Sequence, residues 1–115
     1  MNKRKVGRKL NREIGPRRAL LSGLARNLIL HQRIETSEAR AKELRPFVEK
    51  LVTKARQENL AALRYLKTYI NEDAVWKLLK EIAPKYKERP GGYTRVIKIV
   101  TRRNDASKRA IIEFV

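Results

Sequence analysis

The sequence predicts a single α+β domain. Helices should pack on a small mixed or antiparallel sheet that ends in a C-terminal β-hairpin, with an extended basic arm at the N-terminus. Apolar residues recur at helical spacing through residues 16–83, alternate in the last two apolar segments, and are sparse before residue 16. With 115 residues the chain has the length of one domain. We therefore divide it into an arm, residues 1–15, and one globular body, residues 16–115.

The arm is defined by its charge. The first 18 residues hold eight cations and a single acid, Glu13. The few apolar residues there cannot close a core, so we expect an arm that orders only against a partner.

Helical spacing predicts four helices in the body. The first spans about 16–31 and starts after Gly15, with a proline in its first turn. The second spans about 38–57, and Pro46 should bend it or start a new helix there. Asn59 caps a third helix that ends near Tyr69, and Asn71 caps a fourth that runs to Ala83.

A period of two residues predicts strands. Thr94–Thr101 and Arg109–Val115 alternate apolar and polar residues, and the Asn104–Asp105 turn between them predicts a hairpin. Because an isolated hairpin is marginal in water, Arg33–Thr36 is expected to join as a third strand. The Pro- and Gly-rich residues 84–93 are expected to form a loop.

Composition excludes several classes of protein. The absence of cysteine removes disulfides, thiolate metal sites and thiol nucleophiles. The longest apolar run is four residues, which excludes a membrane-spanning helix. The basic start also has the composition of an Arg-rich transit peptide, an alternative that composition alone leaves open.

The chain offers little for catalysis. His31 is the only histidine and follows an apolar helical segment, where it suits a helix C-terminus. Gly91-Gly92 is too short for a phosphate-binding loop and precedes a strand. The carboxylates have plainer roles at helix starts, strands and turns. We therefore expect no enzyme, no cofactor, no metal and no small-molecule substrate.

The net charge of +17 points to a polyanionic partner. Besides the arm, cations cluster before Gly91 and in the hairpin turn. Tyr86 and Tyr93 either stack on unpaired bases or pack inside the body, and the sequence does not choose between these roles. For Trp76 and Tyr65 we expect packing. Composition also allows a DNA-compacting architectural protein or a module that binds acidic proteins.

Several short motifs, taken in their order along the chain, indicate a protein family, which composition alone does not. The chain resembles the bacterial large-subunit ribosomal protein seventeen family at Arg8–Arg12, Arg18–Leu21, Arg33–Thr36, Ala41–Pro46, Glu81–Pro84, Arg89–Arg95 and Ile111–Glu113. The resemblance runs from about residue 3 to the C-terminus, which leaves no room for a cleaved transit peptide. It departs at Glu13–Pro16, Asn104 and Arg109.

The resemblance implies a cytoplasmic structural protein of the large ribosomal subunit, on the solvent side near the peptide exit. It implies binding to large-subunit ribosomal RNA, contacts with neighbouring ribosomal proteins, and a monomer within the ribosome. Together with the charge clusters it predicts these RNA-binding residues: Lys3, Arg4, Lys5, Arg8, Lys9, Arg12, Arg17, Arg18, Gly91, Gly92, Tyr93, Arg95, Arg102 and Arg103.

Overall fold

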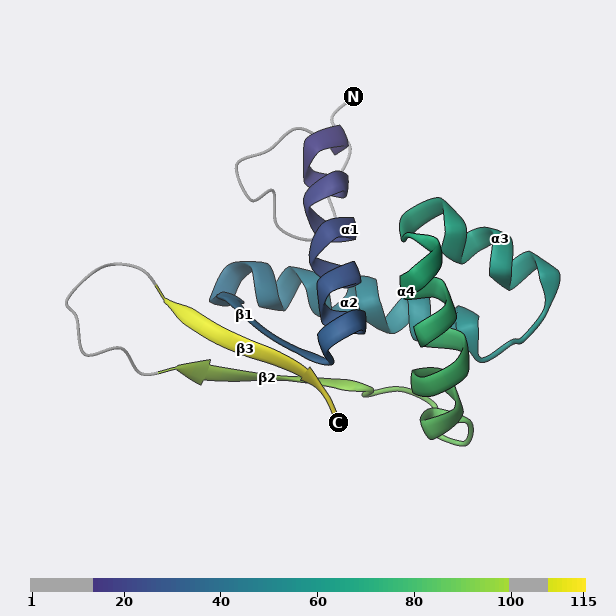
Figure 1. Ribbon diagram of the computed structural model, residues 1–115. Coiled ribbons are helices and arrows are strands. Elements are labelled where there is room, and N and C mark those ends of the chain that lie inside the picture. Colours follow the sequence, from purple (N-terminus) through teal and green to yellow (C-terminus); the bar gives the residue numbers. More distant parts are fainter. Residues whose placement is uncertain (1–13, 100–107) are drawn as a thin grey trace, which may run out of the picture.

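The computed structural model describes residues 14–99 and 108–115 (Figure 1). Residues 1–13 of the predicted arm and residues 100–107 around the hairpin turn lie outside this description, and the predicted arm boundary is wrong by two residues because Ile14 and Gly15 already belong to α1. In chain order the α-helices and strands are α1 (Ile14–His31), β1 (Arg33–Ser37), α2 (Glu38–Ala55), α3 (Leu60–Tyr69), α4 (Glu72–Lys77), β2 (Thr94–Ile99) and β3 (Arg109–Phe114). The predicted α+β class is confirmed.

The strands form one antiparallel sheet in the order β1-β3-β2. Ile111 at its centre pairs with Glu35 of β1 and Ile97 of β2, so β1 is the third strand that the hairpin was expected to need. Helices α1 and α2 lie over one face of this sheet (Figure 1). Successive strand residues face opposite sides, so Thr94 faces the helices whereas Arg95 and Ile97 face away from them.

The core lies between the sheet and the helices. Its fully buried side chains include Leu28 of α1, Leu44 and Leu51 of α2, Leu66 of α3 and Ile112 of β3. Burying a large aliphatic side chain contributes about 1.5–3 kcal/mol relative to exposure. The apolar stripe of α2 thus joins the sheet to the helical layer, and its opposite face stays on the surface.

Side-chain caps fix two helix starts. The Ser37 hydroxyl accepts a hydrogen bond from the Arg40 amide at 3.3 Å, and the Asn59 side chain accepts one from the Ala62 amide at 2.7 Å. Asn71 holds the N-cap position of α4 but makes no side-chain cap bond. Helix α2 runs through Pro46 as one helix, so no new helix starts there.

The fourth helix differs from its prediction. It is α-helical only to Lys77, then widens into a π-helical turn, Leu78–Ile82, and tightens into a 3₁₀ turn, Ala83–Tyr86. The Ala83 amide bonds the Leu78 carbonyl, five residues back. Pro84 follows directly and has no amide to continue the α-helical ladder. The segment predicted as the start of a loop is therefore part of this tapering helix.

Candidate nucleic-acid interface

Fewer than half of the predicted RNA-binding residues lie in the described structure. Those outside it are Lys3, Arg4, Lys5, Arg8, Lys9, Arg12, Arg102 and Arg103. The others are Arg17, Arg18, Gly91, Gly92, Tyr93 and Arg95, and the fold separates them into three environments.

Arg17 and Arg18 are neighbours at the start of α1 with different surroundings. The Arg17 guanidinium is paired with the Glu43 carboxylate of α2, and its side chain is only 16% exposed. Arg17 therefore ties α1 to α2. Arg18 is exposed and holds its guanidinium 4.7 Å from the centre of the Tyr69 ring.

The Tyr69 ring begins a chain of contacts across the surface. It stands edge-on to Phe47 of α2 at 5.7 Å, and 5.0 Å from the ring of Tyr65, one turn earlier on α3. The Lys54 ammonium of α2 lies 5.2 Å from the centre of the Tyr65 ring. Two cations, Arg18 of α1 and Lys54 of α2, thus flank the two tyrosine rings of α3. Such cation–π contacts contribute about 0.5–1 kcal/mol each at exposed sites.

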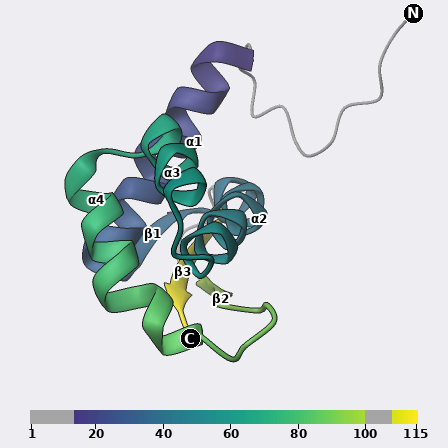
Figure 2. The same cartoon turned by 90° about the vertical axis from the view of Figure 1, so that its right-hand side faces the viewer.

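The same surface continues to the loop before β2. A groove of about 560 Å³ separates α2 from this loop, and its lining includes Lys50, Lys54, Tyr65, Pro90 and Gly91. Figure 2 shows α2 at the edge of the molecule, between α3 and this loop. We call the surface the basic–aromatic row and define it by Arg18, Tyr69, Phe47, Tyr65, Lys54, Lys50 and Gly91.

The row combines open backbone with free positive charge. No atom lies within 4 Å of the position a Cβ would take at Gly91 or Gly92, and Gly92 has a φ of +65°. Within the described part of the chain, none of Arg18, Lys50 and Lys54 pairs with a carboxylate. An anion can therefore reach these groups without breaking an existing ion pair.

The structure does not favour base stacking by Tyr93, because this side chain is buried. Its side chain is 0% exposed, and its hydroxyl accepts a hydrogen bond from Arg56 Nη1 at 2.7 Å. Its ring packs 5.2 Å from that of Tyr86, which is also buried. Tyr93 cannot offer a face to a base while the body is folded. It anchors the glycine loop to α2 instead.

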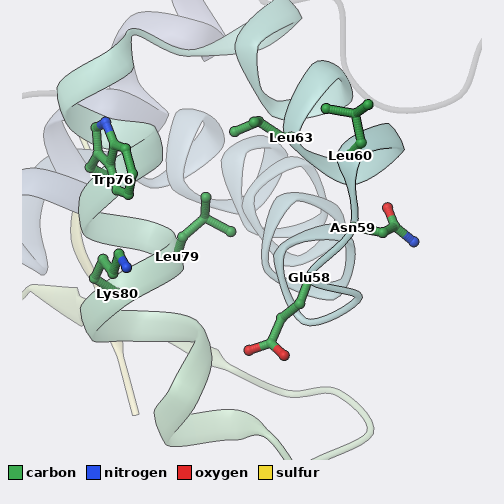
Figure 3. A pocket seen from close by; sticks show the side chains of 7 residues that line it. All are labelled: Glu58, Asn59, Leu60, Leu63, Trp76, Leu79 and Lys80. Carbon is green, nitrogen blue, oxygen red and sulfur yellow. The ribbon is translucent and has the colours of Figure 1, made fainter.

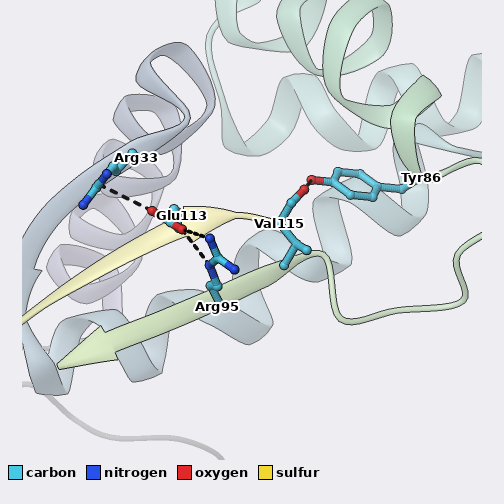
Figure 4. A network of polar contacts seen from close by, with 5 residues as sticks. All are labelled: Arg33, Tyr86, Arg95, Glu113 and Val115. Atoms are coloured by element: carbon cyan, nitrogen blue, oxygen red, sulfur yellow. Dashed lines mark hydrogen bonds and ion pairs between the residues drawn. The ribbon is translucent and has the colours of Figure 1, made fainter.

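Tyr86 is buried for a similar reason. Its hydroxyl donates to the Val115 carbonyl at 2.5 Å (Figure 4). Burial raises the pKa of Tyr86, so this hydroxyl keeps the proton that it donates. Both tyrosines therefore take the packing role, and neither exposes a ring face on which a base could stack.

Arg95 lies on another face. It belongs to the sheet surface that points away from the helices, where its Nε donates to Glu113 at 2.6 Å (Figure 4). Arg33 approaches the same carboxylate from β1 at 3.4 Å. Arg95 remains 59% exposed, but its charge is shared with a carboxylate that is itself only 11% exposed. The structure does not bring Arg95 together with the basic–aromatic row.

Sequence reasoning missed most of the row. Lys50 and Lys54 are four residues apart, opposite the buried stripe of α2, a pattern that an ordinary solvated helix face shows equally well. Tyr65 packs as predicted, on Tyr69. Trp76 does not, because 53% of its side chain is exposed.

His31 is exposed, and across residues 14–99 and 108–115 no group of three His, Cys, Asp or Glu residues is placed to hold a metal ion. No described helix is long and apolar enough to cross a membrane.

A family model described as ribosomal protein L17 matches residues 20–115, the entire helical and sheet body after the first turn of α1. The chain belongs to the ribosomal protein L17 family. It is accordingly a ribosomal protein and not an enzyme, as the missing reaction motifs predict.

Several curated relatives carry the name "Large ribosomal subunit protein bL17". The one from Desulfitobacterium hafniense is 52% identical over 109 residues, covering 94% of this chain and 97% of the relative. The relative from Shouchella clausii is 46% identical over 116 residues, which cover 93% of this chain and 97% of the relative. That from Chlorobium luteolum is 49% identical over all of this chain and 67% of its own length.

The Arg89–Arg95 motif, on which the sequence resemblance partly rests, lies at the end of the row. Gly91 lines the groove, Tyr93 is buried against α2, and Thr94 donates its amide and hydroxyl to Glu49 at 3.2 and 2.9 Å. The motif therefore positions a loop against α2 and leaves its backbone open at the edge of a basic groove.

Proposed function

We propose that this chain is a structural component of the large ribosomal subunit that binds large-subunit ribosomal RNA through the basic–aromatic row and the N-terminal arm. The row carries this proposal. It places unpaired cations and half-buried rings beside an open backbone loop, on one continuous surface of a chain with a net charge of +17.

Phosphate binding follows from this arrangement. Arg18, Lys50 and Lys54 neutralise phosphates and release condensed counterions, which dominates the affinity of proteins for nucleic acid. Gly91 lets the sugar-phosphate backbone approach the loop closely, because no side chain stands there. Tyr65 and Tyr69 lie partly exposed between the cations and favour RNA, whose unpaired bases pack on aromatic side chains.

The arm is the second part of the proposed RNA contact. Residues 1–13 join α1 at Ile14, one turn before Arg18. We propose that Lys3, Arg4, Lys5, Arg8, Lys9 and Arg12 enter between RNA segments, and that Arg102, Arg103 and Arg95 form a second contact. The chain acts as a monomer within the cytoplasmic ribosome, on the solvent side near the peptide exit, beside other large-subunit proteins.

The salt dependence of RNA binding tests the row. Lys50→Gln with Lys54→Gln removes two phosphate contacts, so the slope of log affinity against log salt should fall by roughly 1.5. The matched control is Arg64→Gln with Lys67→Gln, which removes equal charge from the side of α3 opposite Tyr65 and Tyr69. Binding of large-subunit RNA fragments is measured by filter retention at several salt concentrations, with duplex DNA as competitor.

Two results would contradict the proposal. Equal loss in both double variants would mean that net charge alone drives binding. Duplex DNA that competes as well as folded RNA would favour the architectural DNA-binding alternative.

A further inference from the structure

A second groove lies between α3 and α4, away from the row. It has a volume of about 440 Å³ and is lined by Glu58, Asn59, Leu60, Leu63, Trp76, Leu79 and Lys80 (Figure 3). Leu60 is 60% exposed and Trp76 is 53% exposed. Of the described residues, these are the two most exposed large apolar side chains, and both belong to this groove.

The fold creates this apolar surface in addition to the core. Helix α3 already buries Ala62 and Leu66, and α4 already buries Ala74 and Val75. Leu60 and Trp76 lie on the outer sides of these helices. In Figure 3 Leu63 and Leu79 point into the space between them. Lys80 holds its ammonium 5.3 Å from the centre of the Trp76 ring. Leu63 and Leu79 are partly buried against the core, whereas Leu60 and Trp76 remain mostly exposed and do not belong to it.

The charge around this groove favours a protein over RNA as its occupant. Residues 58–83 contain four acids and four cations, so they are neutral while the rest of the chain carries the whole +17. The groove lining itself balances Glu58 against Lys80. A polyanion gains no counterion release at such a surface, whereas apolar contact around a tryptophan is typical of protein interfaces.

Glu58 indicates the charge of the partner. It lies at the rim in a left-handed backbone conformation, with a φ of +53°, at the turn from α2 to α3. It is exposed, and no described cation lies within ion-pair distance of it. A basic protein is repelled by most of this chain's surface, but at this groove it meets a neutral surface and a free carboxylate.

We propose that this groove docks a second, basic protein of the large ribosomal subunit. The partner inserts a bulky apolar side chain among Leu60, Leu63, Trp76 and Leu79 and places a lysine or arginine against Glu58. This inference rests on the proposed function, since RNA neutralises the charge of both proteins and brings them together. Two free copies of this chain lack that neutralisation and repel each other at +17 each.

Trp76 itself provides the test, because it is the only tryptophan in the chain. The chain is produced with 7-azatryptophan, whose emission can be excited apart from that of other proteins. Acrylamide quenching is then measured for the free chain, for the chain bound to large-subunit RNA alone, and for the chain built into subunits that lacked it. We expect quenching to be unchanged by RNA and to fall severalfold in the subunit.

The outcomes separate the two proposals. Failure to enter subunits or to bind RNA contradicts the proposed function. A chain that binds normally while Trp76 stays as accessible as in the free chain overturns only the docking inference. Protection by RNA alone assigns the groove to RNA, and protection of the free chain at high concentration assigns it to a second copy. Both results also overturn the inference.

Two variants give a second readout. Each variant is mixed with an equal amount of wild-type chain, and the ratio of variant to wild type in the assembled subunits is measured. Trp76→Ala and Glu58→Lys should each lower this ratio, by about tenfold or more for Trp76→Ala. Affinity for RNA alone should stay within twofold. Both residues are exposed, so thermal unfolding should be unchanged and serves as the folding control. The matched control is Ile97→Ala, which truncates an exposed apolar residue on the sheet. Equal incorporation of all three variants would refute the docking surface.

Discussion

Removing one oxygen atom from Tyr93 separates its structural role from a role in RNA binding. In Tyr93→Phe the ring remains, but Arg56 Nη1 loses the hydroxyl that accepts its 2.7 Å hydrogen bond. Thr53 Oγ1, 3.4 Å from the same hydroxyl, loses a weaker contact. Arg56 keeps a second bond, from Nη2 to the Lys87 carbonyl at 2.9 Å. The substitution therefore removes one of several contacts that hold the glycine loop against α2, among them the bonds from Thr94 to Glu49.

The expected loss can be worked from these contacts. A hydrogen bond to a charged group contributes about 1.5–3 kcal/mol net. Arg56 retains one partner and is partly exposed, so we expect the lower end of this range, about 1.5 kcal/mol. For a chain of this length that lowers the unfolding midpoint by about 5 °C. RNA affinity should stay within twofold, because Tyr93 is not on the surface.

Circular dichroism measures the midpoint, and filter retention of a large-subunit RNA fragment measures affinity on the same preparation. Tyr69→Leu is the contrasting variant, because the Tyr69 ring lies in the basic–aromatic row beneath Arg18. It should weaken RNA binding about fivefold or more. A Tyr93→Phe variant with unchanged stability and weakened RNA binding would return Tyr93 to the interface and refute this reasoning.

Three further substitutions test polar contacts that stabilise the body around the basic–aromatic row. Glu113→Gln should lower the free energy of unfolding by about 1–2 kcal/mol in urea, because it leaves two arginines without their shared carboxylate; unchanged stability would show that this cluster is only a surface feature. Asn59→Ala should cost about 1 kcal/mol through loss of the α3 cap, and an unchanged urea midpoint would contradict the cap assignment. The Lys42 hydrogen bond, together with the charges of Lys42 and Lys98, lowers the pKa of Glu38, so its contribution to stability is full above the ordinary glutamate pKa and is lost as pH falls through the lowered value. In Glu38→Gln the free energy of unfolding should therefore fall less steeply between pH 6 and pH 3 than in the wild type. Identical pH profiles for the two proteins would contradict this role of Glu38.

Local signals predicted most of the fold. Asn59 preceded a helix because its side chain caps one, and the alternation through Thr94–Ile99 predicted a strand because one face of that strand is buried. The change at Leu78–Ile82 was not predictable in this way. A π-helical turn keeps nearly the same apolar spacing as an α-helix, and a proline can follow either kind of turn.

The site was harder to predict because it is assembled from distant segments. Arg18, Tyr69 and Lys54 belong to three helices, and no local pattern places them side by side. Tyr93 shows the opposite error. A tyrosine beside two glycines has the composition of an RNA-binding loop. In the structure, however, this ring is buried, and its hydroxyl bonds to Arg56 at the end of α2. Which side a residue presents depends on the neighbouring elements, and the sequence of one segment does not contain that information.

Tethered cleavage tests the central claim most directly. The chain has no cysteine, so Lys50→Cys and, as the matched control, Lys67→Cys each provide one attachment point for an iron–EDTA group. Each labelled chain is built into large subunits, and hydroxyl-radical cleavage of the RNA is mapped. We predict strong, localised cleavage of large-subunit RNA from position 50 and markedly weaker cleavage from position 67. Cleavage from position 67 alone, or from neither position in subunits that contain the chain, would contradict the account.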